Sequence, residues 1–223
     1  MKILLIADEE APYLWDYYQP GRLDGIDFTL SCGDLKQEYL EFLVTMSSRP
    51  LYYVHGNHDK GYVNFPPEGC ECLDDTLTVI KGLRVLGLGG CIRYNQGPYQ
   101  YTEKEMAARI ARLRRTIRKA GGVDIVVTHA PPRGYGDAED NAHRGFEAFL
   151  PLMDEFHPQY LLHGHVHQSY GHGHPRRIQY GDTTIMNCVG WQVLEVDAPE
   201  LPEQKKGFWA RFSRKKAIDN KTE

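Results

Sequence analysis

Five short apolar runs along the chain each end in a cluster of polar residues. The runs are Lys2–Ala7, Asp27–Cys32, Leu51–His55, Asp124–Thr128 and Tyr160–His163. A continuous apolar run of this length is typical of a strand that is buried on both faces. We therefore predict five buried strands, each of which brings polar side chains to its carboxyl end.

Helical patterns lie between these runs. Gln37–Met46 and Phe146–Phe156 carry apolar residues at helical spacing. Thr102 and Glu105 form a capping box at the start of a third helix, which ends at Gly121-Gly122. The polar face of this third helix carries Arg109, Arg112, Arg115, Arg118 and Lys119. We interpret that stripe as a solvated face rather than a binding surface.

Two further regions are predicted to be β structure without an intervening helix. Thr76–Ile80 and Leu83–Leu88 flank Lys81-Gly82, which is a hairpin signal. Near the C-terminus we predict an antiparallel meander of three strands, Arg177–Tyr180, Thr183–Val189 and Gln192–Val196. Together these elements predict an α/β fold, a four-layer αββα sandwich of two mixed β-sheets flanked by helices. It would form one domain over residues 1–200, followed by a basic, flexible tail over 201–223.

Charge and cysteine usage narrow the classes of partner and compartment. The net charge is −4. The last 21 residues carry a net +4, so the rest of the chain is acidic and gives no strong signal for nucleic-acid binding. Five irregularly spaced cysteines favour reduced thiols, and the apolar runs are too short for a signal peptide or a membrane span. We expect a soluble, cytoplasmic protein, and nothing in the sequence indicates its oligomeric state.

The polar clusters supply oxygen and imidazole ligands from five separate places. They are Asp8, Gly33-Asp34, Gly56-Asn57-His58-Asp59, Thr128-His129-Ala130-Pro131 and His163-Gly164-His165-Val166-His167. Because His165 and His167 are two residues apart, they face the same side of an extended segment. Hard oxygen and imidazole donors in this number predict a site for two metal ions, which most often hydrolyses phosphate esters.

The order of these clusters resembles the calcineurin-like metallophosphoesterase superfamily, from Asp8 to about Val196. The resemblance implies that Asp34 bridges two metal ions. Asp8 and His167 would complete the first metal site, and Asn57, His129 and His165 the second. It also implies that a hydroxide bridging the ions attacks phosphorus, that His58 protonates the leaving oxygen, and that Asp59 orients the ring of His58.

The chain departs from the family pattern at Glu10, where the family has histidine. Glu10 is either a metal ligand or a carboxylate near the site that leaves the first metal under-coordinated, and we favour the ligand. A third carboxylate would reduce the charge of the centre and favour hard ions at the first site. We therefore expect two divalent ions, manganese or iron, with zinc or nickel as alternatives.

Several other residues have two interpretations. Arg93 follows a glycine-rich turn and could bind phosphate, and His143 lies in a polar loop that could contact substrate. His163 is interpreted as a hydrogen-bonded interior histidine. His172 and His174 are interpreted as solvated loop residues rather than a third metal site. Cys70 and Cys72 could chelate a metal or oxidise, but isolated reduced thiols are the favoured interpretation.

These sequence features are compatible with two functions from different classes. The favoured one is a metal-dependent phosphoesterase that hydrolyses phosphomonoesters or small phosphodiesters. The alternative is a catalytically weak or silent scaffold that keeps the fold in order to bind a protein partner. The presence of His58 and of nearly all the expected ligands favours the enzyme. Aromatic and basic residues after residue 202 could contact a lipid surface or a partner, although a solubilising tail is favoured.

Overall fold

The computed structural model describes residues 1–167 and 175–197. The strands are β1 Lys2–Ala7, β2 Phe28–Ser31, β3 Leu51–Tyr53, β4 Cys70–Cys72, β5 Leu77–Ile80, β6 Leu83–Leu88, β7 Cys91–Ile92, β8 Gln100–Tyr101, β9 Ile125–Thr128, β10 Tyr160–His163, β11 Arg177–Tyr180, β12 Thr183–Asn187 and β13 Gly190–Glu195. The helices are α1 Gln37–Ser47, α2 Glu103–Lys119 and α3 Phe149–Phe156, with the short 3-10 helix η1 at Asp59–Val63.

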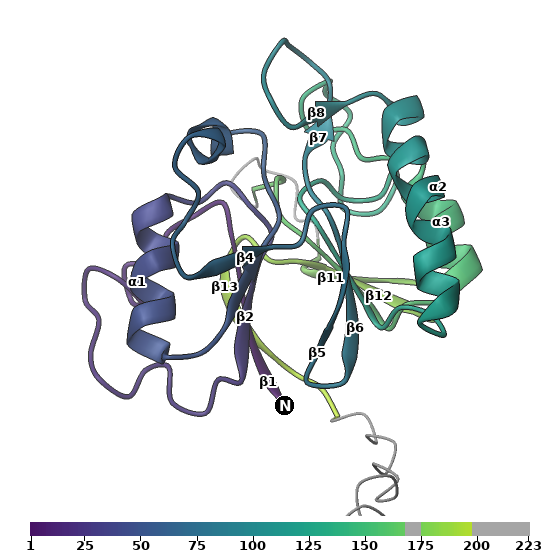
Figure 1. The fold of residues 1–223 in the computed structure, drawn as a ribbon. Helices are drawn as coiled ribbons and strands as arrows, with labels where there is room; N and C mark the ends of the chain where they lie inside the picture. The colour runs from purple at the N-terminus through teal and green to yellow at the C-terminus, as the bar shows by residue number, and fades with distance from the viewer. Residues whose placement is uncertain (168–174, 198–223) are drawn as a thin grey trace, which may run out of the picture.

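The larger strands form two mixed sheets (Figure 1). The first has the order β13-β1-β2-β3-β4, and the second has the order β11-β12-β10-β9-β6-β5. Strands β1 to β4 run parallel to one another, and β6, β9, β10 and β12 do the same in the other sheet. Parallel strands end at one edge of a sheet, so their following loops gather there.

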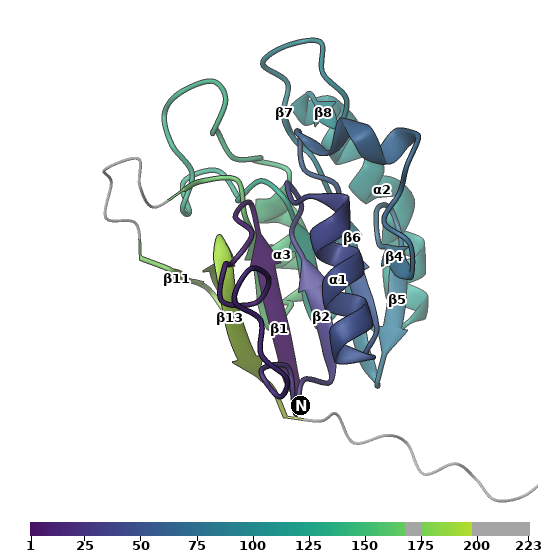
Figure 2. The same ribbon diagram turned by 90° about the vertical axis from the view of Figure 1, so that its left-hand side faces the viewer.

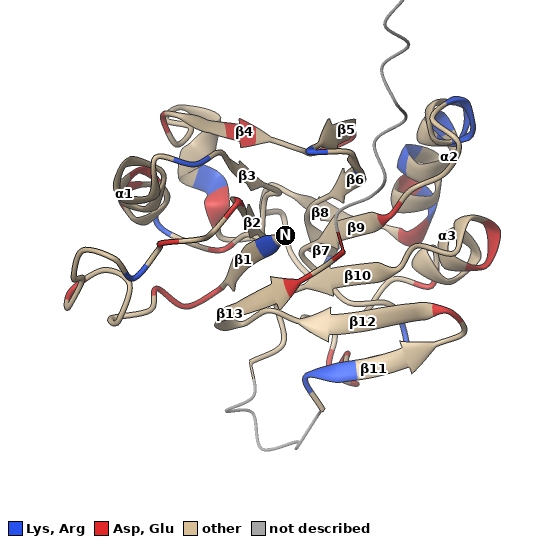
Figure 3. Cartoon of the chain, turned by 90° about the horizontal axis from the view of Figure 1, so that it is seen from below, with Lys and Arg blue, Asp and Glu red and all other residues tan. Residues whose placement is uncertain are grey.

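The two sheets face each other, and the helices cover their outer faces (Figures 1 and 3). One apolar cluster, which includes Leu5, Leu30 and Val127, fills the space between the sheets. Helix α1 packs on the outer face of the first sheet (Figure 2), and α2 and α3 pack on the outer face of the second. The predicted αββα sandwich is confirmed.

The predicted C-terminal meander is wrong in its last strand. β11 and β12 form an antiparallel hairpin, but β13 leaves that sheet and pairs with β1 of the other one. Gly190 has φ +78°, a conformation that favours glycine and lets the chain turn between the sheets. The open edge of β1 then gains a partner, and Leu194 is buried between the sheets.

Most of the predicted local features are present, including the hairpin of β5 and β6. The capping box of α2 is confirmed, because Glu105 N donates to Thr102 Oγ1 at 3.2 Å and Thr102 N donates to Glu105 Oε2 at 2.7 Å. The solvated stripe on α2 is wrong for Arg109, which is 4% exposed and pairs with Asp75. No helix among the described residues is long and apolar enough to cross a membrane. His172, His174 and the proposed tail lie outside the described residues.

Candidate active site

The polar clusters of both sheets meet at one end of the sandwich. Asp8 and Asp34 follow β1 and β2 of the first sheet, and His129 and His165 follow β9 and β10 of the second. His165 N donates to Asp8 Oδ1 at 3.0 Å, and the ring of His129 contacts Cys32 O at 2.8 Å, so hydrogen bonds tie the two sheets together at this point. The strand ends thus bring together residues that lie 157 positions apart in the sequence.

The backbone at this edge lets neighbouring loops approach the carboxylates of Asp8 and Asp34 closely. Asp8, Asp34 and His165 adopt left-handed conformations with φ of 60°, 58° and 67°, which cost energy for residues with a side chain. A Cβ atom at Gly56 would lie 2.0 Å from Asp34 Oδ1, and one at Gly164 would lie 2.2 Å from Asp8 Oδ2. Only glycine leaves room for these two carboxylates.

Asp34, His129 and His165 place their ligand atoms within 4.8 Å of one another. His129 Nε2 lies 3.3 Å from Asp34 Oδ2 and 3.0 Å from Asn57 Oδ1. The four residues predicted for the second metal site are therefore brought together. Carboxylate, amide and imidazole donors that converge in a buried space fit a divalent cation.

Backbone carbonyls orient both imidazoles of this group. His129 Nδ1 contacts Cys32 O at 2.8 Å, which turns Nε2 toward Asp34. The ring of His165 is held through Nε2, which lies 2.7 Å from Ala142 O, so its Nδ1 remains for a metal. A histidine that binds metal commonly donates its other ring nitrogen to a carbonyl in this way.

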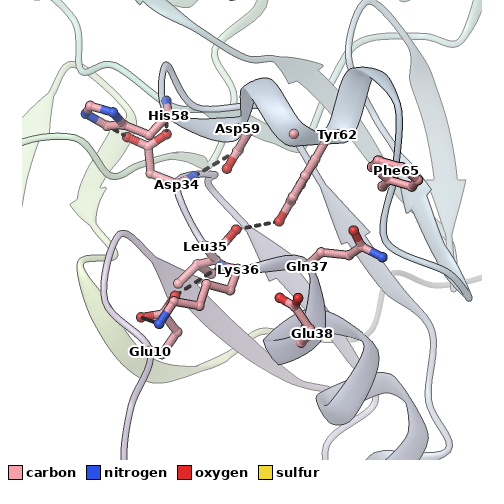
Figure 4. Close-up of a pocket in the computed structure, with 11 residues that line it drawn as sticks. Glu10, Asp34, Leu35, Lys36, Gln37, Glu38, His58, Asp59, Tyr62 and Phe65 are labelled. Carbon is pink, nitrogen blue, oxygen red and sulfur yellow. Dashed lines mark hydrogen bonds and ion pairs between the residues drawn. The ribbon is translucent and has the colours of Figure 1, made fainter.

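Asp8 and His167, which were predicted for the first metal site, lie close together. His167 Nε2 lies 3.8 Å from Asp8 Oδ1, and His167 Nδ1 lies 3.0 Å from Glu9 Oε1. Glu9 therefore orients the imidazole, a role that sequence reasoning missed and that only its position beside Asp8 could have suggested. The carboxylate of Glu10 instead accepts a hydrogen bond from Lys36 N at 3.0 Å (Figure 4). We propose that Glu10 is the near-site carboxylate of the two alternatives.

Substituting these two glutamates separately tests that assignment. We expect Glu9→Gln to weaken metal binding at the first site by roughly 10- to 100-fold, because the imidazole of His167 loses its carboxylate partner. The matched variant Glu10→Gln should keep both ions. Metal content after dialysis, measured by mass spectrometry, checks both. Loss of an ion from Glu10→Gln but not from Glu9→Gln would make Glu10 the ligand.

Buried charge dominates the electrostatics of the cluster. Burial and the neighbouring carboxylate of Asp34 raise the pKa of Asp8 to about 6, against the lowering effect of His129. Burial would raise the pKa of Asp34, but His129 lowers it to about 2. For His129 itself, burial acts to lower the pKa, and the carboxylates of Asp34 and Asp8 raise it to about 10. Two buried carboxylates thus attract positive charge to this space, which a divalent cation would supply.

His58 lies at the rim of the cluster. Its backbone N–H donates to Asp34 Oδ1 at 2.7 Å, while its side chain is 76% exposed. The ring Nε2 lies 4.0 Å from Asp34 Oδ2. Asp59 does not orient this ring through any described contact. Its carboxylate instead accepts hydrogen bonds from Gly56 N at 2.7 Å and from Asp34 N at 3.0 Å.

The two predicted substrate contacts differ in their placement. His143 lies beside the cluster, with its ring centre 5.1 Å from that of His165. The guanidinium of Arg93 is instead paired with Glu105, which caps α2. Sequence reasoning also missed Tyr94, whose hydroxyl accepts a hydrogen bond from Asn57 Nδ2 at 3.1 Å and so orients the amide.

His163 is confirmed as an interior histidine. It is 1% exposed, and its Nδ1 lies 3.0 Å from Gly164 O. Burial lowers the pKa of its imidazole to about 4, so the ring is neutral at neutral pH.

Comparison with known proteins identifies the family. The model of the calcineurin-like phosphoesterase family matches residues 1–169. The chain belongs to that family, as the order of its polar clusters indicated.

Individual relatives are distant. The chain is 28% identical over 122 residues to the UPF0046 protein T07D4.2 of Caenorhabditis elegans, covering 52% of this chain and 27% of the relative. It is 31% identical over 66 residues to the UPF0046 protein K07C11.7 of the same organism, covering 30% of this chain and 21% of the relative. The match thus spans about a quarter of the length of these relatives.

Solved structures share the fold. The protein TT1561 of Thermus thermophilus is similar with a TM-score of 0.55 and 15% identity, covering 85% of this chain and 89% of that one. A second solved structure has a TM-score of 0.60 at 14% identity and covers 86% of this chain and 94% of that one. At such identities the likeness supports the four-layer fold alone.

Proposed function

We propose that this protein is a metal-dependent phosphoesterase that hydrolyses phosphomonoesters or small phosphodiesters with two divalent metal ions. The observation that carries the proposal is the convergence of carboxylate, amide and imidazole ligands beside an exposed histidine. The proposed first site consists of Asp8, Asp34 and His167, and the second of Asp34, Asn57, His129 and His165. Two such ions activate a water molecule as the nucleophile and neutralise charge on the phosphoryl group.

His58 is the proposed proton donor. The hydrogen bond from its backbone N–H to Asp34 fixes the position of the His58 backbone beside the cluster. The exposed ring lies on the solvent side of the cluster. A leaving oxygen with high proton affinity needs a proton as its bond to phosphorus breaks. The leaving group must therefore lie on the side of His58.

A groove extends from this side of the cluster and suits a leaving group. It has a volume of about 360 Å³. Asp34 and His58 lie at one end, and Phe65 lies at the other (Figure 4). Between them the lining includes Gln37 and Tyr62. An aromatic ring, an amide and a phenol favour a ring-bearing leaving group with polar edges.

Phe65→Ala tests the groove. Phe65 is 68% exposed, so the change should leave the fold intact. We expect KM to rise by about three- to tenfold for phosphate esters with an aromatic leaving group, because an aromatic contact is lost. KM for glycerol phosphate should not change. Val63→Ala is the matched control, since Val63 is also exposed and does not line the groove. Equal effects of the two variants in steady-state kinetics would contradict the assignment.

The phosphoesterase proposal is tested by turnover. Folded protein, stripped of metal and reloaded with manganese, iron, zinc or nickel, should hydrolyse p-nitrophenyl phosphate or bis-p-nitrophenyl phosphate in a colorimetric assay. Without Glu10 as a third carboxylate ligand, manganese and iron are still expected because Asp8, Asp34 and Asn57 supply oxygen ligands, and the three imidazoles make zinc and nickel the alternatives. Absence of turnover with every ion would favour the scaffold function instead.

A further inference from the structure

A second group of metal-binding side chains lies outside the proposed active site. His55 follows β3, Cys72 ends β4, and Asp74 follows two residues later. Their ligand atoms all lie within 4.8 Å of one another. This group contains a thiol, whereas the proposed dinuclear site has only carboxylate, amide and imidazole ligands.

The contacts converge on a single nitrogen. His55 Nδ1 lies 2.7 Å from Asp74 Oδ2 and 3.8 Å from Cys72 Sγ. A nucleophilic triad uses opposite ring nitrogens of its histidine, one for the nucleophile and one for the carboxylate, so this geometry is not that of a triad. A carboxylate oxygen and a thiol sulfur instead approach the same ring nitrogen, and the three ligand atoms lie close enough together to share one metal ion.

The distances are close to those that zinc requires. Tetrahedral zinc with ordinary bond lengths separates sulfur and nitrogen ligands by about 3.6 Å, and nitrogen and oxygen ligands by about 3.4 Å. The sulfur–nitrogen distance of 3.8 Å is already near that value. The nitrogen–oxygen pair, now 2.7 Å apart, would open by about 0.7 Å to admit the ion.

The surroundings hold two of the three ligands in place and leave the third accessible. Asp74 Oδ1 accepts a hydrogen bond from Gly89 N at 2.7 Å, which leaves Oδ2 for an ion. The ring of His55 stacks on Tyr99 with centres 4.1 Å apart. Cys72 is exposed, so an ion can enter from solvent and the thiol can adjust. Such outer contacts raise metal affinity because they orient the ligands before binding.

We propose that His55 Nδ1, Cys72 Sγ and Asp74 Oδ2 form a third metal site that binds a zinc-like divalent ion, with water as the fourth ligand. A thiolate and a carboxylate balance the charge of the ion, and the thiolate selects zinc over manganese. The site joins the ends of β3 and β4. The backbone of His55 is already held by a hydrogen bond from Gly90 N to His55 O at 2.7 Å. An ion bound to the His55 ring would further restrict the backbone directly before Asn57 and His58.

Cobalt binding tests the proposal because sulfur ligation has its own spectrum. Chelator-treated, reduced full-length protein is titrated with Co²⁺, and the near-ultraviolet thiolate-to-cobalt band is recorded. With cobalt in excess of all proposed sites, we expect the band to reach the amplitude of one cobalt–thiolate site per chain in the parent and in Cys70→Ser, since the Cys70 thiol contacts Glu68 O instead. Cys72→Ser should abolish the band. Asp74→Asn should weaken the cobalt affinity that the band reports by at least about tenfold.

The outcomes separate this site from the dinuclear one. With excess Zn²⁺ followed by gel filtration, the parent should retain one more zinc per chain than Cys72→Ser. Turnover of p-nitrophenyl phosphate with manganese should be the same in both. Absence of the band in the parent, or its persistence in Cys72→Ser, would overturn the proposal. Its loss in Cys70→Ser as well would indicate a chelate of the two cysteines and would also overturn it.

Discussion

Asp34→Asn is expected to abolish metal-dependent phosphoesterase activity, with a loss in kcat of at least about 10³-fold, the equivalent of several kcal/mol of charge stabilisation. Asp34 lies at the centre of the cluster, 3.3 Å from His129 Nε2, and also accepts the backbone hydrogen bond of His58. Its pKa of about 2 means that the substitution removes a full negative charge at neutral pH. Both proposed metal sites share this carboxylate, so both should weaken.

The measurement for Asp34→Asn is metal content together with steady-state kinetics. Asn has nearly the same shape as Asp and can still accept the hydrogen bond from His58, so thermal melting should show a folded protein. Asp154→Asn is the matched control, because Asp154 lies on α3 and contacts Tyr180 instead. An Asp34→Asn protein that keeps two ions and full turnover would refute the shared-ligand assignment.

His58→Asn is expected to lower kcat by an amount that depends on the leaving group. For an alkyl phosphate the loss should be about 10²- to 10⁴-fold, the contribution of a general acid. For p-nitrophenyl phosphate it should be much smaller, because p-nitrophenolate leaves without a proton. Metal content should not change, because His58 is not one of the proposed metal ligands. Its side chain is 76% exposed, and its Nε2 lies 4.0 Å from Asp34 Oδ2.

The comparison of two substrates is what makes the His58 experiment specific. A ligand or a structural residue would slow both substrates alike, whereas a proton donor changes their ratio. His157→Asn is the control, because His157 is also exposed but pairs with Asp182, away from the cluster. An equal loss for both substrates, or loss of an ion, would show that His58 has another role.

The sequence predicted the features that arise from local patterns. Residues 3–7 of β1 are buried on both faces because the strand lies between the core and α1, as its apolar pattern predicted. The capping box of Thr102 and Glu105 is likewise local, since both partners lie within one turn. The polar clusters could be assigned to one edge because parallel strands end there.

The sequence could not assign roles that depend on side-chain direction. Glu9 and Glu10 are neighbours, and the spacing from Asp8 favoured Glu10, yet Glu9 contacts His167 and Glu10 contacts Lys36. Helical periodicity placed Arg109 on a solvated face, but its side chain is buried and donates hydrogen bonds to Asp75 and to Gly89 O. In each case a partner from a distant segment decides where the charged group lies.

The local pattern of apolar and polar residues therefore determined the strands, the helices and the types of residue available to bind metal. The pairing of β13 with β1 and the meeting of His55, Cys72 and Asp74 were decided only by the tertiary structure. The physical reason is that backbone propensity and burial act over a few residues, whereas hydrogen bonds and ligand geometry depend on which strand ends become neighbours. A strand edge or a ligand atom finds its partner only after the sheets have packed.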